Sequence, residues 1–259
     1  MDARGVPSQF TFDHGTDRAP VWSPDGRRIA FESDRDGQYK LYWNDTARAG
    51  DDHLLLQAGG SPEATGWSSD GQFLLFWTHP PNTGTGYDLW VLPGMAGDSA
   101  QRKPVPYLQT PFDETQGQFC PEPTGGPRWV AYTSNASSSV EVYVQSFPVG
   151  SGKFLISSGG GTQPRWRRDG KELFYLAANG KLMSVEVTTT PTFSHGAPKA
   201  LFDPHEDTGG VPQFPFRYDV SPDGKRFLVV TNPRVNDAVN ETQSSPITVV
   251  VNWMASLKP

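Results

Sequence analysis

The sequence has one cysteine, Cys120, and no long hydrophobic run. A single cysteine excludes an internal disulfide framework and a cysteine-rich metal site. No apolar stretch approaches the roughly 18 residues that a membrane-spanning helix needs, and the first residues lack the apolar stretch of a signal peptide. We therefore expect no membrane insertion, and a cytoplasmic location for the polypeptide as written.

Basic residues are fewer than acidic ones, 22 Lys and Arg against 28 Asp and Glu, which gives a net charge of −6. Nucleic acids and anionic membranes require a basic face, so we expect neither as a partner. Familiar catalytic motifs are also missing: there is no Gly-x-Ser-x-Gly, P-loop, His-Glu-x-x-His or kinase signature. Gly and Pro, in contrast, number 27 and 24 of 259 residues, which is typical of an all-β chain rich in turns.

Five copies of one short pattern run through the chain, each an aromatic or apolar residue followed by an acidic turn. They occupy residues 22–26, 67–71, 119–125, 166–170 and 220–224, and an apolar run follows each. A period of roughly 40 to 50 residues with several strands per unit is the signature of a β-propeller. The sequence therefore predicts an all-β propeller, with residues 1–259 forming a single domain of turn-rich blades.

The acidic residue of each turn has a structural explanation. An Asp side chain accepts hydrogen bonds from backbone N–H groups two residues on, and the following Gly supplies a positive φ. We expect this role for all five turn residues: Asp25, Asp70, Glu122, Asp169 and Asp223.

Each repeat unit predicts four strands, but the fifth unit lacks a fourth. Residues 9–12 resemble the fourth strands of the other units. We expect them to pair with residues 247–253 and complete the last of five four-stranded blades, because closure removes two exposed sheet edges. Alternatively, two chains share a ring, so the protein is expected to be a monomer or a strand-sharing dimer.

The Ser-Pro-Asp-Gly turns followed by Arg-Arg-Ile-Ala-Phe-type strands resemble the TolB-like, WD40-like (PD40) propeller family. Residues 161–175 and 246–253 resemble, more particularly, the C-terminal propeller of membrane-anchored serine/threonine kinases common in acidobacteria. The resemblance covers essentially the whole chain and implies a sensor or scaffold module. That family usually has six or more blades, which implies a shortened form or a fragment; a fragment of such a kinase would be extracytoplasmic.

Propeller topology predicts which loops share a rim at the channel mouth, where ligands commonly bind. Arginines shortly before the turns and polar residues of these loops are candidates for binding a protein segment or a small molecule: Arg18, Arg165, Arg217, Glu63 and Asn135. Carboxylates with imidazoles also suit a divalent cation such as Ca, Zn or Mn. The candidate metal ligands are His14, Asp17, His79, Asp113, Glu114, His205, Glu206 and Asp207.

Two functions follow from these observations. The first is a non-catalytic binding propeller, because no catalytic motif is present. The alternative is a metal-dependent hydrolase of lactones, esters or phosphotriesters, in which a channel-bound cation polarises the substrate or activates water. No spacing singles out three metal ligands, and polar loops are usually simply solvated, so the sequence favours the binding module with no certain cofactor.

Overall fold

The computed structural model of the protein describes residues 9–48, 50–81, 83–96, 102–123, 125–150, 152–204, 216–230 and 247–251, the last of these by its backbone alone. The chain divides into two compact units, Met1–Glu114 and Thr115–Pro259. All regular structure in these residues is β-strand. No helix there is long and apolar enough to cross a membrane.

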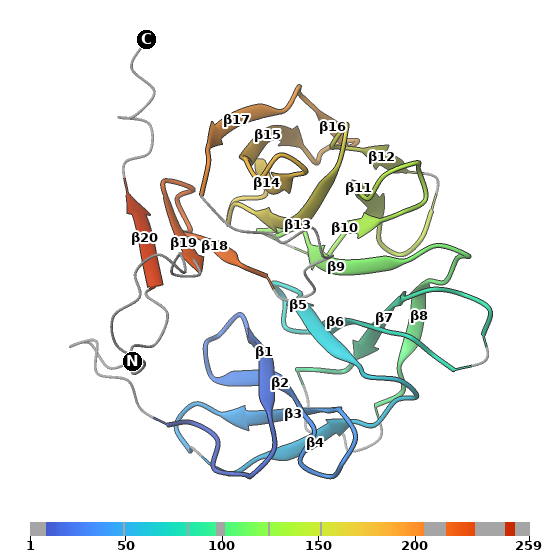
Figure 1. Ribbon diagram of the computed structural model, residues 1–259, viewed down its shortest axis with the longest axis vertical. Helices are drawn as coiled ribbons and strands as arrows, with labels where there is room; N and C mark the ends of the chain where they lie inside the picture. Colours follow the sequence, from blue (N-terminus) through green and yellow to red (C-terminus); the bar gives the residue numbers. More distant parts are fainter. Residues whose placement is uncertain are drawn as a thin grey trace, which may run out of the picture. The chain divides into compact units, whose positions relative to one another are not determined.

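The first unit holds two antiparallel sheets, each with four strands in sequence order (Figure 1). The first sheet consists of β1 (Asp17–Trp22), β2 (Arg28–Ser33), β3 (Lys40–Asp45) and β4 (His53–Leu56). The second consists of β5 (Glu63–Trp67), β6 (Phe73–Thr78), β7 (Asp88–Pro93) and β8 (Val105–Leu108). The four strands predicted from the first and second repeat copies are therefore confirmed.

The second unit holds three antiparallel sheets. The first of them consists of β9 (Glu114–Phe119), which starts at the unit boundary, β10 (Trp129–Ser134), β11 (Glu141–Ser146) and β12 (Lys153–Leu155). The next consists of β13 (Gly161–Trp166), β14 (Glu172–Ala177), β15 (Leu182–Thr188), β16 (Ser194–His195) and β17 (Lys199–Phe202), with β16 and β17 both paired to β15. The last described sheet consists of β18 (Tyr218–Val220), β19 (Arg226–Val230) and β20 (Ile247–Val251).

The apolar runs that follow the turns form the cores of both units. In the first unit, Leu41, Leu74 and Phe76 belong to one buried cluster, against which Trp43 and Trp90 pack. In the second unit, one cluster surrounds Val142 and Leu173, and another joins Phe174 to Phe227. Strands with apolar side chains on both faces fit sheets that are covered on both sides.

The acidic turns fold as their sequence predicts. Asp25 Oδ1 accepts hydrogen bonds from the Ser23 hydroxyl at 2.6 Å and the Arg27 backbone N–H at 3.0 Å. Asp70 and Asp223 accept the corresponding hydrogen bonds, and the glycine after each has a φ near +70°. These carboxylates therefore stabilise turns. Asp169 also accepts a backbone N–H two residues on, whereas Glu122, in a longer turn, pairs with Arg128.

The strand predicted at residues 9–12 is not formed. These residues belong to no strand, and the Phe10 carbonyl instead accepts a hydrogen bond from the Gly50 N–H in the loop before β4. The Gln9 side-chain amide donates a hydrogen bond to the Thr11 backbone carbonyl, so this carbonyl also has a local partner. Within the described part of the chain, β20 is paired with β19 alone.

Candidate functional site

Arg18 lies on β1, where the chain is irregular. The register of β1 with β2 shifts between Arg18 and Val21, and Ala19 in this bulge has a φ of 51°. Bulges redirect side chains, and left-handed non-glycine residues are uncommon and often functional. The local backbone therefore sets the direction in which Arg18 projects.

The Arg18 guanidinium is held by a buried carboxylate. Its Nε donates to Glu32 Oε2 at 2.6 Å and its Nη2 to Glu32 Oε1 at 3.2 Å. The Glu32 side chain is fully buried, whereas that of Arg18 is 48% exposed, and the guanidinium lies 4.0 Å from the centre of the Tyr39 ring. No described residue accepts a hydrogen bond from Arg18 Nη1, so two of the guanidinium's three nitrogens have partners in the described part of the chain.

Glu63, the first residue of β5, lies beside this pair. Burial raises the pKa of Glu63 to about 8, and the Glu32 carboxylate adds to the effect, whereas the Arg18 guanidinium and the Trp77 indole N–H oppose it. Burial also raises the pKa of Glu32, although Arg18 counteracts this. Glu63 is therefore mostly protonated at neutral pH. We call Arg18, Glu32, Tyr39 and Glu63 the first-strand cluster.

The sequence thus predicted two residues, Arg18 and Glu63, that the structure brings together. It missed Glu32 and Tyr39, which lie in the second strand and the following loop. A carboxylate inside the apolar second strand, in Ile-Ala-Phe-Glu, is the sequence signal that could have identified Glu32.

The three other predicted ligand residues lie in the second unit. The Arg165 Nη1 donates to Gln118 Oε1 at 3.2 Å, and its guanidinium lies 3.7 Å from the centre of the Phe216 ring. Burial lowers the pKa of Arg165, and Asp219, 3.8 Å from its Nε, opposes the change. Arg217 donates its backbone N–H to Gln163 Oε1, and Asn135 lies in the loop between β10 and β11.

Several predicted metal ligands are engaged with other groups. Asp17 pairs with Arg35, and the His79 ring nitrogen Nδ1 lies 3.1 Å from the Gly86 carbonyl oxygen. Asp113 accepts the Tyr87 backbone N–H, and Glu114 accepts the Thr110 hydroxyl at 2.5 Å.

His14 lies exposed before β1, and His205, Glu206 and Asp207 lie outside the described residues. The described residues contain no group of three or more His, Cys, Asp or Glu side chains that could hold a metal ion. The candidate ligands within them therefore do not fit a divalent cation.

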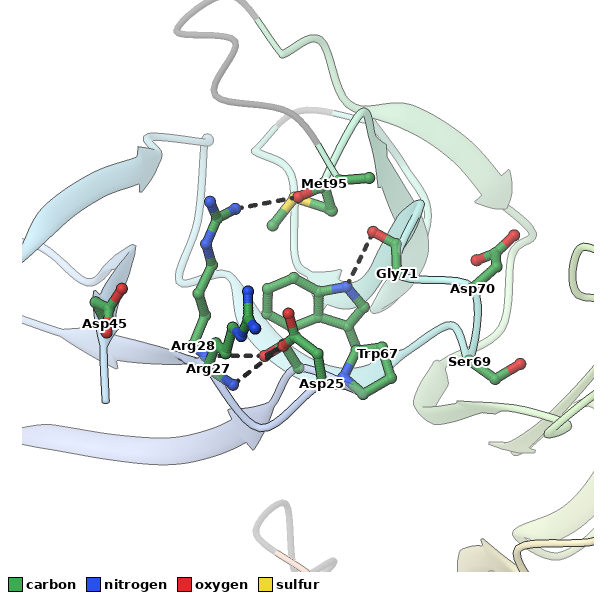
Figure 2. A pocket seen from close by; sticks show the side chains of 12 residues that line it. Asp25, Arg27, Arg28, Asp45, Trp67, Ser69, Asp70, Gly71 and Met95 are labelled. Atoms are coloured by element: carbon green, nitrogen blue, oxygen red, sulfur yellow. Dashed lines mark hydrogen bonds between the residues drawn. The ribbon is translucent and has the colours of Figure 1, made fainter. Parts of the chain in front are cut away.

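A groove that the sequence did not predict lies in the first unit, where the β1–β2 and β5–β6 turns meet. It has a cavity volume of about 560 Å³. Figure 2 shows the Trp67 indole at its centre, with Arg27 and Arg28 to one side and Met95 above. The turn pattern predicts a structural role for these residues, so nothing in the sequence indicates a binding surface here.

Comparisons with known proteins identify the fold. No protein-family model matches the sequence, and no curated protein matches it significantly. Among solved structures, TolB from Acinetobacter baumannii is 15% identical with a TM-score of 0.62, over 92% of this chain and 52% of the other. The chain thus spans about half the length of that structure.

Two further structures are similar. A protein described as TolB from Agrobacterium tumefaciens is 17% identical with a TM-score of 0.61, over 91% of this chain and 76% of the other. The Cps50 (Swd1) β-propeller domain of Myceliophteria thermophila is 13% identical with a TM-score of 0.52, over 93% and 73%. The chain therefore has an all-β propeller fold of the TolB-like, WD40-like type.

Proposed function

We propose that this chain is a non-catalytic binding propeller that holds a protein segment or a small molecule at the first-strand cluster. The observation that carries the proposal is the half-exposed Arg18, fixed by two hydrogen bonds to the buried Glu32 and stacked on Tyr39. Pre-ordered arginines of this kind recognise carboxylates and phosphates, because little side-chain entropy remains to be lost.

The protonation of Glu63 supports an anionic ligand. With Glu63 neutral, the charges of Arg18 and Glu32 cancel, and the open Arg18 Nη1 can donate to an incoming acceptor. An ionised Glu63 would leave the cluster with a net negative charge that repels anions. The favoured partner is therefore an acidic protein segment or a small anion.

The proposal extends to the organisation and setting of the chain. The two compact units would belong to one propeller domain, and the resemblance to kinase-linked propellers favours a sensor or scaffold role. In that setting the domain would be extracytoplasmic; as a separate polypeptide it would be cytoplasmic.

A peptide array tests this function. The purified chain is expected to bind acidic peptides in preference to basic peptides of equal length. The Arg18→Gln/Glu32→Gln variant removes both charges of the ion pair without leaving either unpaired, and it should lose this preference. Equal binding of both peptide classes by the wild-type chain, or an unchanged preference in the double variant, would contradict the proposal.

A further inference from the structure

The groove between the β1–β2 and β5–β6 turns has the aromatic ring of Trp67 in its otherwise largely polar lining. Met95 is buried, and Trp67 packs against the same core cluster. The Trp67 indole N–H lies 3.4 Å from the Gly71 carbonyl oxygen, so its polar atom is engaged within its own turn (Figure 2). A cavity of about 560 Å³ is within the range that holds small molecules.

Arg27 supplies a positive charge at this groove that no described carboxylate contacts directly. Its guanidinium makes no hydrogen bond or ion pair with the described residues, and its side chain is exposed. Its neighbour Arg28 is engaged, because its Nη1 donates to the Met95 carbonyl at 3.3 Å and its guanidinium lies 4.5 Å from the centre of the Trp43 ring.

A structurally equivalent arginine in the second unit binds a carboxylate. The Arg27 carbonyl accepts the Thr46 N–H, and the Arg128 carbonyl accepts the Phe147 N–H, so Arg27 and Arg128 hold the same place after their turns. The Arg128 Nη2 donates to Glu122 Oε2 at 2.8 Å. Both members of this pair line a groove in the second unit, which has a volume of about 510 Å³.

The first unit lacks the equivalent ion pair because its turn is shorter and its acid is an aspartate. Asp25 Oδ1 is engaged by the Ser23 hydroxyl and the Arg27 backbone N–H, and these hydrogen bonds lower the pKa of Asp25. The carboxylate therefore caps its own turn, and the Arg27 guanidinium, which acts on Asp25 through its charge, keeps its N–H groups for a carboxylate from elsewhere.

We propose that this groove is a second binding site, which takes a small aromatic carboxylate. The aromatic ring would lie against Trp67, and the carboxylate would accept hydrogen bonds from Arg27, as Glu122 does from Arg128. Arginine and carboxylate pair well because the planar guanidinium matches the two carboxylate oxygens.

Three aspartates, Asp25, Asp45 and Asp70, also line the groove, and their negative charges oppose the binding of a carboxylate. Asp45 and Asp70 accept backbone N–H groups of their own turns, as Asp25 does. With Arg27 and Arg28, these three aspartates give the lining three negative and two positive charges, so affinity for a carboxylate has to come from its direct contact with the Arg27 guanidinium, and comparing ligands of opposite charge is the decisive measurement.

Isothermal titration calorimetry on the full chain, with three matched probes, shows which ligand charge the groove prefers. Indole-3-acetate is expected to bind one per chain. Indole-3-acetamide, which has the same ring without the charge, should bind about tenfold more weakly, the effect of losing one charge-assisted hydrogen bond. Tryptamine, which carries the opposite charge, should bind more weakly still.

Three variants locate the site. Arg27→Gln should weaken indole-3-acetate binding about tenfold, whereas Arg128→Gln and Arg18→Gln/Glu32→Gln should leave it unchanged. Because Arg27 is exposed, its substitution should not prevent folding. The proposal is overturned if the acetate fails to saturate the protein, if the amide binds equally well, if tryptamine binds more tightly, or if Arg27→Gln has no effect. Retained affinity in the first-strand double variant separates this site from the proposed peptide site.

Discussion

The side-chain carbonyl of Gln116 accepts a hydrogen bond of 2.8 Å from the backbone N–H of Gln163. The two glutamines hold the same position, three residues before the ends of β9 and β13, and both have left-handed φ values, 55° and 57°. Gln163 repeats the arrangement, because its Oε1 accepts the N–H of Arg217, the residue before β18. Each buried glutamine therefore links the first strand of one sheet to that of the next.

This link predicts the effect of Gln163→Leu. The substitution keeps the side-chain size but removes the acceptor of a partly buried backbone N–H, which costs about 1–3 kcal/mol. Urea unfolding followed by circular dichroism should show a correspondingly lower free energy of unfolding. Gln72→Leu, at an exposed position, is the control and should change stability by less than about 0.5 kcal/mol. Equal stability of the two variants would show that the link contributes nothing.

The Arg18–Glu32 ion pair predicts a non-additive double variant. Arg18→Gln leaves Glu32 buried without its two charged hydrogen bonds and should lower the free energy of unfolding by about 1–3 kcal/mol. Adding Glu32→Gln removes the buried charge and should restore much of that loss. A double variant at least as unstable as the sum of both single variants would contradict this interpretation.

The raised pKa of Glu63 predicts a pH dependence of stability. The folded pKa, about 8, exceeds the ordinary value of 4.5, so the folded chain binds more protons than the unfolded chain between these values. Its contribution to the free energy of unfolding is therefore fully present below about pH 4.5 and is lost as the pH rises through about 8. Glu63→Gln should flatten this decline. Urea unfolding at several pH values between 5 and 9 measures this decline. Parallel plots of the free energy of unfolding against pH for the wild-type chain and Glu63→Gln would contradict the raised pKa of Glu63.

Metal analysis tests the remaining enzymatic alternative. We expect no stoichiometric cation and no effect of EDTA on the melting temperature, because the described residues contain no group of three or more His, Cys, Asp or Glu side chains that could hold one. One ion per chain whose removal lowers the melting temperature would contradict this, since ligands stabilise folded proteins by mass action. That result would point to His205, Glu206 and Asp207, and turnover of an ester or lactone panel would then favour the hydrolase.

The sequence by itself determined the repeat, the turns and the strands. A turn such as that at Asp25 is made by groups within a few residues of one another, Ser23 and the Arg27 N–H, so local chemistry is sufficient to predict it. The period of the apolar runs likewise fixed the strands, because their side chains must be buried wherever the sheets pack.

Only the tertiary structure decided which polar side chains are available to bind a ligand. Arg18 and Glu63 are 45 residues apart in the sequence, and the burial that keeps Glu63 protonated comes from neighbours outside its own strand. Asp17, a metal-ligand candidate by its sequence position, pairs with Arg35, and Arg128, unlike Arg27, has a carboxylate of its own turn as a partner. Charge state and availability depend on long-range neighbours and on desolvation, which a one-dimensional pattern does not contain.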